Sequence, residues 1–200
     1  MSETPSIKRV VVASNISGTV LTDYITPNYQ CTKNDRNLAS FFQSIAAIAK
    51  EFDDGELQLV SFGPTGSNSS SSPLLGGSND GNLNVALFME NDIISGILYT
   101  VESDDVPQDQ RTKMSKLARN IHSAFCSDHL DFYQKEEVHK ELNNAFQNSE
   151  DLPPALKDRF ASFVVKIPGI INSSAKAQPA PEPVHSGSAA SLSSASDYDD

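Results

Sequence analysis

The order of the elements that the sequence predicts constrains this chain more than any single motif does. Residues 8–13 (KRVVVA) form a largely β-branched apolar run, which predicts a strand covered on both faces. Turn residues at 15–18 and a second strand-like segment at 19–25 complete a hairpin, in which Gly18 can adopt a positive φ. A long amphipathic segment follows before the next strand. This order predicts an α+β domain built around one sheet.

One helix is predicted between the second and third strands. Asp35 stands where an N-cap is expected. The apolar residues after it fall on one helical face: Leu38, Phe41, Phe42, Ile45, Ile48, Ala49 and Phe52. That spacing is typical of a helix that lies on a sheet. Strands follow at 56–62, 83–89 and 93–101, and Gly96 in the last one predicts a bulge or a close approach.

Three helices are predicted after the strands. The first opens near Pro107, ends near Tyr133 and buries a stripe of Met114, Leu117, Ile121, Ala124 and Phe125. The second carries Val138, Leu142, Ala145 and Phe146. The third begins at Pro153 and is expected to end at Pro168 and Gly169.

The chain is expected to contain one folded domain. We expect a disordered N-terminus at 1–6, a folded domain at 7–172 and a disordered acidic tail rich in Ser, Ala and Pro at 173–200. A Gly/Ser-rich stretch at 64–82 is expected to be a flexible insertion in the domain. A functional lid is the alternative for that stretch.

The formal net charge of −11 at pH 7 limits the partners of the chain. A field of that sign repels phosphate backbones and anionic lipid, so we expect neither nucleic acid nor a membrane surface as a general partner. The first residues lack a signal-peptide pattern, and no apolar run approaches the roughly 20 residues that span a bilayer. The two cysteines, Cys31 and Cys126, suggest a reduced cytoplasmic protein, with a disulfide between them as the alternative.

Side chains suited to metal binding or nucleophilic chemistry gather in the first of the three later helices. His122, Cys126 and His129 follow spacings of four and three residues, and His139 lies in the next helix. Imidazole and thiolate groups there suit zinc, or a cysteine nucleophile with a histidine base. Because no paired metal-ligand motif accompanies them, we favour residues that flank the core. We therefore expect no catalytic residue and no metal site.

Other patterns do not indicate catalysis or phosphate binding. Paired carboxylates at 53–54, 104–105 and 136–137 stand at helix ends, where solvated charges are expected. Residues 63–66 lack the Gly-Lys-Ser/Thr ending of a phosphate-binding loop. The chain is therefore not expected to be a GTPase or kinase itself, and no cofactor is expected.

Four bases in a short stretch of this acidic chain form the candidate partner-binding site. They are Arg111, Lys113, Lys116 and Arg119. Such a group can dock an acidic partner or a lipid head group. The alternative is a solvated outer helix face that balances nearby acids.

The element order β-β-α-β-β-β-α-α resembles the longin domain and, more loosely, its roadblock relatives. The resemblance is carried by the hairpin of 8–13 and 19–25, the helix of 38–52, the strand start at 55–59 (GELQL) and the helix of 114–125. It covers residues 7–167 and rests on topology and apolar pattern. It implies a five-stranded antiparallel sheet in the order 2-1-5-4-3, with one helix on one face and the later helices on the other. The insertion and the extra terminal helices depart from the family.

The resemblance also implies a function: a non-catalytic protein-interaction module in vesicle trafficking or small-GTPase regulation. The implied partners are a small GTPase or another longin- or roadblock-type subunit, in a homo- or heterodimer, docked at the sheet edges of 19–25 and 56–62. The expected location is cytoplasmic, reaching endomembranes through partners and without direct membrane insertion. Two alternatives stay open. One is a small-molecule sensor domain of the Per-Arnt-Sim type, although the single long helix favours a longin; the other is a metal-dependent enzyme using His122, Cys126 or His129.

Overall fold

The computed structural model describes the sheet and the helices that follow it. The described residues are 5–27, 29, 40–45, 47, 59–62, 82–101, 106–148 and 152–176. Several predictions therefore lie outside them: those for Cys31, most of the helix at 38–52, nearly all of the insertion at 64–82 and the tail from residue 177.

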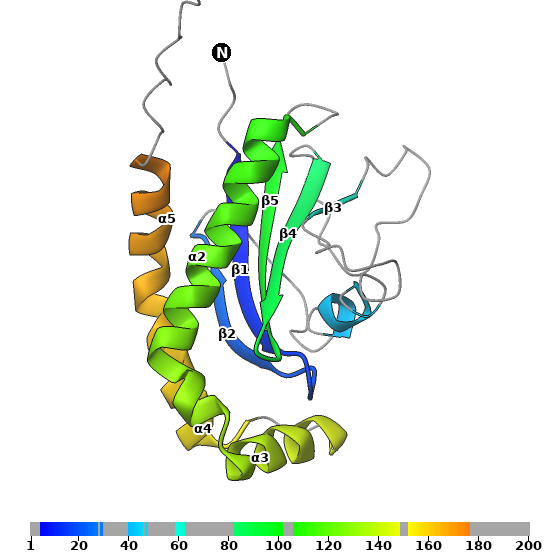
Figure 1. Cartoon of the computed structure of the whole chain (residues 1–200), viewed down its shortest axis with the longest axis vertical. Helices are drawn as coiled ribbons and strands as arrows, with labels where there is room; N and C mark the ends of the chain where they lie inside the picture. The colour runs from blue at the N-terminus through cyan, green and yellow to red at the C-terminus, as the bar shows by residue number, and fades with distance from the viewer. Residues whose placement is uncertain are drawn as a thin grey trace, which may run out of the picture.

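The elements follow the predicted order along the chain (Figure 1). The strands are β1 (Ser6–Ser14), β2 (Val20–Ile25), β3 (Leu59–Phe62), β4 (Asn82–Glu90) and β5 (Ile93–Val101). The helical elements after them are α2 (Gln108–Tyr133), α3 (Glu136–Gln147), α4 (Pro154–Ala161), the 3₁₀ helix η1 (Ser162–Lys166) and α5 (Ile167–Lys176). Residues 40–45 are also helical.

All neighbouring strands of the sheet are antiparallel. β2, β1, β5 and β4 lie side by side in that order, and helices pack on them. This confirms the predicted α+β fold with an antiparallel sheet. The short β3 pairs its backbone with the other side of β4, with Leu59 opposite Ala86, and so forms an edge.

Both faces of the sheet are buried. Val10 and Val12 of β1 pack in a cluster with α2, α4 and η1, whereas Val11 and Ala13 pack in a second cluster with Phe42. All nine residues of β5 are buried. Alternate residues of one strand therefore meet two different helical layers, which confirms the prediction of a strand covered on both faces.

The two hairpin turns use residues in the left-handed region. Gly18, in the turn between β1 and β2, has a φ of +68°, as the sequence predicts. The β4–β5 turn consists of Asn91 and Asp92, with φ values of 52° and 59°. A two-residue hairpin turn with two positive φ values is of type I′, in which Asn and Asp are favoured.

A partly buried ion pair joins Arg9 of β1 to Asp23 of β2. The Arg9 guanidinium donates from Nε to Asp23 Oδ1 at 2.7 Å and from Nη2 to Asp23 Oδ2 at 2.6 Å. Arg9 is almost completely buried on the strand face that it shares with Val11 and Ala13. A bidentate contact of this kind satisfies a charge that would otherwise be costly to bury. The apolar-run analysis of residues 8–13 did not predict it.

The predicted end of the last helix at Pro168 and Gly169 was wrong. The chain leaves α4, passes through η1 and continues as α5 from Ile167 to Lys176. Pro168 is the second residue of α5, a position at which its missing N–H costs no hydrogen bond within the helix. Ile167 is fully buried, which anchors α5 to the core. Residues 173–176, assigned from sequence to the tail, are therefore helical.

Among the described residues, no helix combines the length and the apolar character needed to cross a membrane.

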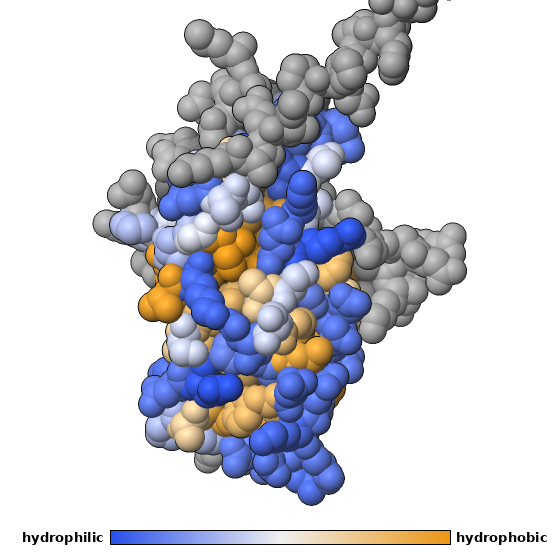
Figure 2. Space-filling model, turned by 60° about the vertical axis from the view of Figure 1, so that its left-hand side comes forward, coloured by the Kyte–Doolittle hydropathy of each residue, from blue (hydrophilic) through white to orange (hydrophobic). Residues whose placement is uncertain are grey.

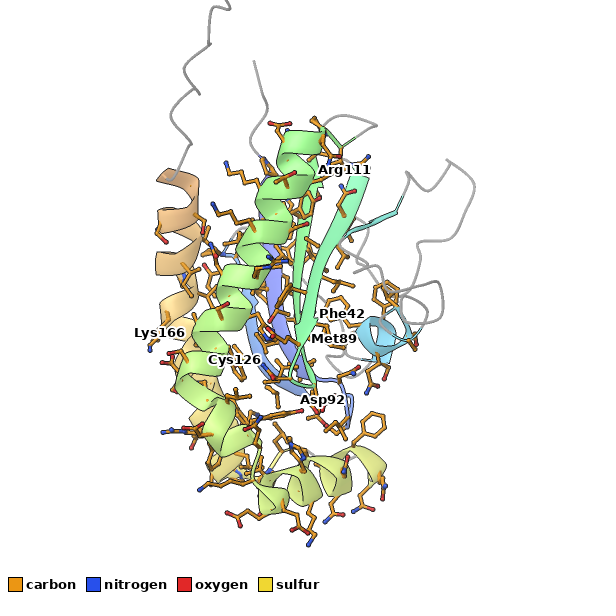
Figure 3. The ribbon with its side chains drawn as sticks, viewed as in Figure 1. Phe42, Met89, Asp92, Arg111, Cys126 and Lys166 are labelled. Carbon is orange, nitrogen blue, oxygen red and sulfur yellow. The ribbon has the colours of Figure 1, made fainter. Side chains whose placement is uncertain are left out.

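Gly96 marks a close approach between the sheet and Phe42 of the helical residues 40–45. A Cβ atom at this position would lie 2.6 Å from Cε2 of Phe42 and 3.2 Å from Cδ2 of Leu87. Figure 3 shows Phe42 on the side of the sheet away from α2. This confirms the close approach that the sequence predicts for Gly96, because neither the phenyl ring nor β5 has room to move in a packed core.

We expect Gly96→Ala to lower the free energy of unfolding by about 1–3 kcal/mol, the usual cost of overpacking a core. Urea unfolding followed by circular dichroism measures it. Gly169→Ala is the matched control, since no described atom lies within 4 Å of that added Cβ and Ala is the better helix former. Equal stability of Gly96→Ala and the wild type would contradict this account of the packing.

Candidate functional site

Helix α2 positions most of the side chains that the sequence analysis singled out. Its 26 residues cross the sheet face formed by β1, β4 and β5 (Figure 1). The buried residues of α2 are Gln110, Met114, Leu117, Ala118, Ile121, His122, Phe125, His129 and Tyr133. Their spacing leaves the opposite side of the helix to solvent, where the basic residues lie.

The four candidate partner-binding bases differ in their surroundings. Arg111 Nε donates to the Val106 carbonyl at 2.8 Å, next to the start of α2. The Arg119 guanidinium lies over the Phe88 ring of β4, with Cζ 4.9 Å from the ring centroid. Lys113 and Lys116 are exposed. All four bases are exposed, and the two arginines also contact groups of the domain.

The face of the molecule over α2 and α5 is mainly hydrophilic. Figure 2 shows it as charged and polar side chains that separate small apolar patches. Val165 of η1 is a large apolar side chain that is exposed. Isolated apolar residues are normal on a protein surface. Charge rather than apolar area is therefore the distinguishing property of this face.

His122 is buried in a chain of three polar groups. Its Nδ1 lies 3.4 Å from the Ser95 hydroxyl of β5, and its Nε2 lies 3.3 Å from the Cys126 Sγ one turn further along α2. The Phe88 ring meets the imidazole edge-on at 4.9 Å. Whichever nitrogen carries the proton, both have a partner.

The surroundings of His122 and Cys126 do not favour a thiolate–imidazolium pair. Burial lowers the pKa of His122, and the nearby Glu90 opposes that shift. Burial also raises the pKa of the Cys126 thiol, and Glu90 adds to the increase. Both groups are thereby kept neutral, whereas a cysteine nucleophile needs its thiolate. The arrangement holds α2 against β5 and has weak nucleophilic potential.

The other two histidines lie in separate environments. His129 is buried among phenyl rings of α2, α4 and η1. His139 of α3 lies edge-on against Tyr133, with ring centroids 4.9 Å apart. Within the described ranges, no group of three or more His, Cys, Asp or Glu side chains is placed to hold a metal ion. Of the four residues that the sequence analysis grouped, the structure brings His122 and Cys126 together and places His129 and His139 in other surroundings.

The carboxylate pairs contribute little to a site. Glu136 and Glu137 are exposed in the first turn of α3, where negative charge favours the helix dipole, and Glu136 pairs with Lys140 at 2.8 Å. The pairs at 53–54 and 104–105 lie outside the described residues, as does the segment at 63–66.

Sequence reasoning missed a buried hydrogen-bond network at the end of α2. The Tyr133 hydroxyl donates to the Asp92 carbonyl at 2.9 Å, so the Ser14 hydroxyl, also 2.9 Å away, donates to the tyrosine oxygen. Burial raises the pKa of Tyr133 to about 12. Ser14 and Tyr133 stand 119 positions apart, and no local pattern marks either as a partner. The network fixes the end of α2 against both hairpin turns.

We expect Cys126 to react slowly with iodoacetamide in a Cys31→Ser background. Because burial raises the pKa of the thiol, its rate should keep rising with pH after that of an exposed cysteine has levelled off. Mass spectrometry of the alkylated protein gives the rate, and a short unfolded peptide that contains residues 122–130 is the control. A rate independent of pH between 6 and 8 would indicate a stable thiolate and contradict the neutral pair.

Comparison with known proteins gives no assignment. No protein-family model matches the chain. No curated protein matches it either.

Proposed function

We propose that this chain is a longin-like, non-catalytic interaction module, a subunit of a vesicle-trafficking or small-GTPase regulatory complex. The observation that carries the proposal is the strand order β2-β1-β5-β4-β3. In that order the β1–β2 hairpin lies at one side of the sheet, and the last strand, β5, lies at the centre beside β1. The proposal rests on this resemblance of topology, which supports a fold more directly than it supports a function.

The arrangement of the helical layers supports the same proposal. Helical residues 40–45 come between β2 and β3 in the chain, and Phe42 and Ile45 pack on one sheet face. α2 follows β5 directly and packs on the other face. One helix on one face and the later helices on the other is the arrangement that the longin resemblance implies. We further propose a cytoplasmic location, with access to endomembranes through partners.

The outer edge of β2 supplies backbone groups for a partner strand. The Thr26 N–H donates to the Lys8 carbonyl at 3.0 Å, which marks this opposed pair as hydrogen-bonded. Opposed pairs alternate in an antiparallel ladder, so Ile25, which lies opposite Arg9, directs its N–H and C=O away from β1. The Ile25 side chain is also exposed. We infer that a partner adds an extended strand beside Ile25.

The lysine pair on α2 supports an acidic partner. Lys113 and Lys116 are exposed, with Arg111 and Arg119 on the same helix. In a chain of net charge −11, a local group of bases orients an approaching acidic surface. We propose these four residues as the electrostatic part of the partner-binding surface.

The first test is an affinity purification of tagged protein from its native lysate, with GDP and with a non-hydrolysable GTP analogue. Ile25→Pro should weaken recovery of the small GTPase or second subunit by about tenfold or more, because it removes an outward donor and disturbs the edge. Ile25→Val keeps the N–H and is the matched control. Circular dichroism should show both variants folded, since the β1 pairing uses the N–H groups on either side of Ile25.

Two results would contradict the edge model. Full recovery with Ile25→Pro would place the contact elsewhere on the domain. An unfolded Ile25→Pro monomer would show that Ile25 belongs to the core of the fold and is no docking residue.

A second test addresses the charge contribution. Lys113→Glu with Lys116→Glu should slow association with the recovered partner and reverse the salt dependence of its rate, because steering charges act mainly on association. Lys157→Glu with Lys140→Glu changes the same charge at exposed positions of α4 and α3 and is the control. Stopped-flow or biosensor kinetics at two salt concentrations gives the rates. If the two double variants slowed association equally, Lys113 and Lys116 would act only through the net charge of the protein, and the proposed role of their position would be wrong.

A further inference from the structure

His129 occupies an aromatic cage between three helical elements. It is 4% exposed, on the buried side of α2. Its ring centroid lies 4.9 Å from that of Phe125 on α2, 5.8 Å from Phe160 on α4 and 6.1 Å from Phe163 on η1. The imidazole therefore sits at the contact between α2 and the C-terminal segment formed by α4, η1 and α5.

The imidazole of His129 is unsatisfied in this cage. Neither Nδ1 nor Nε2 has a hydrogen-bond partner among the described residues. A neutral imidazole always carries one N–H, and burying that group without an acceptor is unfavourable. His122, buried on the same helix, has a partner for each nitrogen. A phenylalanine at position 129 would extend the aromatic cluster without this cost, so the polar side chain calls for an explanation beyond packing.

Charged groups surround the cage on each of its three elements. Asp128 on α2 is an acid that acts on His129, and it is bound by Lys166 of η1 at 2.6 Å. Arg159 of α4 is the other cation that acts on His129, and its guanidinium lies over the Phe132 ring. A positive charge on the imidazole would thus face two cations and one acid that is already paired.

We propose that His129 is an acid-sensitive latch, whose protonation releases the segment Pro154–Lys176 from α2. Among the described residues the cage offers no acceptor for the one N–H of the neutral imidazole, and protonation adds a positive charge and a second N–H without an acceptor. Release lets the charged ring reach water. It also withdraws α4 from β2, where the Thr22 hydroxyl donates to the Phe160 carbonyl at 2.8 Å.

The direction of the pH dependence follows from the state of His129 in each form. Burial is the largest influence and lowers the pKa of the docked imidazole, Asp128 opposes this, and Arg159 and Lys166 lower it further. When the segment is released, His129 on α2 is exposed to water and its pKa returns to its ordinary value of about 6.5. The released form therefore binds more protons below that pH. The segment is most firmly docked at pH values above the ordinary pKa of histidine. Its docking weakens as the pH falls toward the lowered pKa that His129 has in the docked form.

The size of the effect has an upper limit. With a released-state pKa of about 6.5, the ratio of released to docked molecules rises at most about tenfold between pH 7.5 and 5.5. The docked form remains the major one if it strongly predominates at neutral pH. The latch therefore changes how often the segment opens.

Hydrogen exchange of the full chain, read by mass spectrometry at pH 7.5 and 5.5 and corrected for intrinsic rates, tests the proposal. In the wild type, the opening of α4 and η1 should rise several-fold and up to about tenfold at pH 5.5, with β1 and β5 unchanged. His129→Phe should abolish the difference. His129→Gln, which does not titrate, is the second variant and decides the matter if phenylalanine does not fold.

His122→Asn is the matched control, because it removes the other buried imidazole of α2 and leaves the cage intact. It should keep the acid response of α4 and η1. Three results would each overturn the latch: equal exchange of the wild type at the two pH values, an acid response that persists in the His129 variants, or an equal acid response of β1 and β5.

Discussion

The two-sided burial of β5 is the constraint on which the rest of the structure depends. All nine of its residues are buried, and successive residues meet different layers: the Ser95 hydroxyl lies beside His122 of α2, and Gly96 lies against Phe42 on the other face. An antiparallel sheet often leaves one face to solvent, but this strand requires a helix on each side. β5 therefore sets the position of both helical layers relative to each other.

Polar groups in this core fall into two kinds. The Tyr133 hydroxyl and the His122 imidazole each bond to groups of the sheet or its turns, and so they specify where α2 lies. Arg9 and Asp23 do the same for the first hairpin through two charge-assisted bonds. His129 differs, because it is nearly as buried and lacks such a bond among the described residues. Networks that are satisfied add specificity, whereas an unsatisfied group lowers the stability of the contact in which it lies.

The sequence predicted those parts of the fold in which a local pattern of residues is compatible with only one kind of element. The apolar run before Ser14 predicted a doubly covered strand, the turn around Gly18 predicted a positive φ, and the stripe of α2 predicted a helix that ends near Tyr133. The missed features depend on contacts between distant residues. Pro168 predicts a helix end from sequence, but in the structure it lies at the start of α5, which the buried Ile167 anchors to the core.

The candidate site was less predictable than the fold, for a related reason. Composition locates the bases of α2 on one helix, yet it does not indicate that Arg119 lies over the Phe88 ring or that Arg111 donates to the Val106 carbonyl. Helical spacing groups His122 with His129, but it does not distinguish a side chain with partners on β5 from one enclosed by phenyl rings of other helices. Those differences arise from which elements pack against each face of α2.

Because both sheet faces are covered, the surfaces left for a partner are the sheet edges and the outer sides of the helices. The β2 edge that we propose for strand addition is supported on one face by α4 and η1, through contacts that include the bond from Thr22 to the Phe160 carbonyl. Phe160 is also a wall of the His129 cage. An event that loosens the cage therefore removes a support from the docking strand. Partner binding at β2, if it requires a rigid edge, should weaken under the same acidic conditions that release α4, which would link the two proposals through one residue.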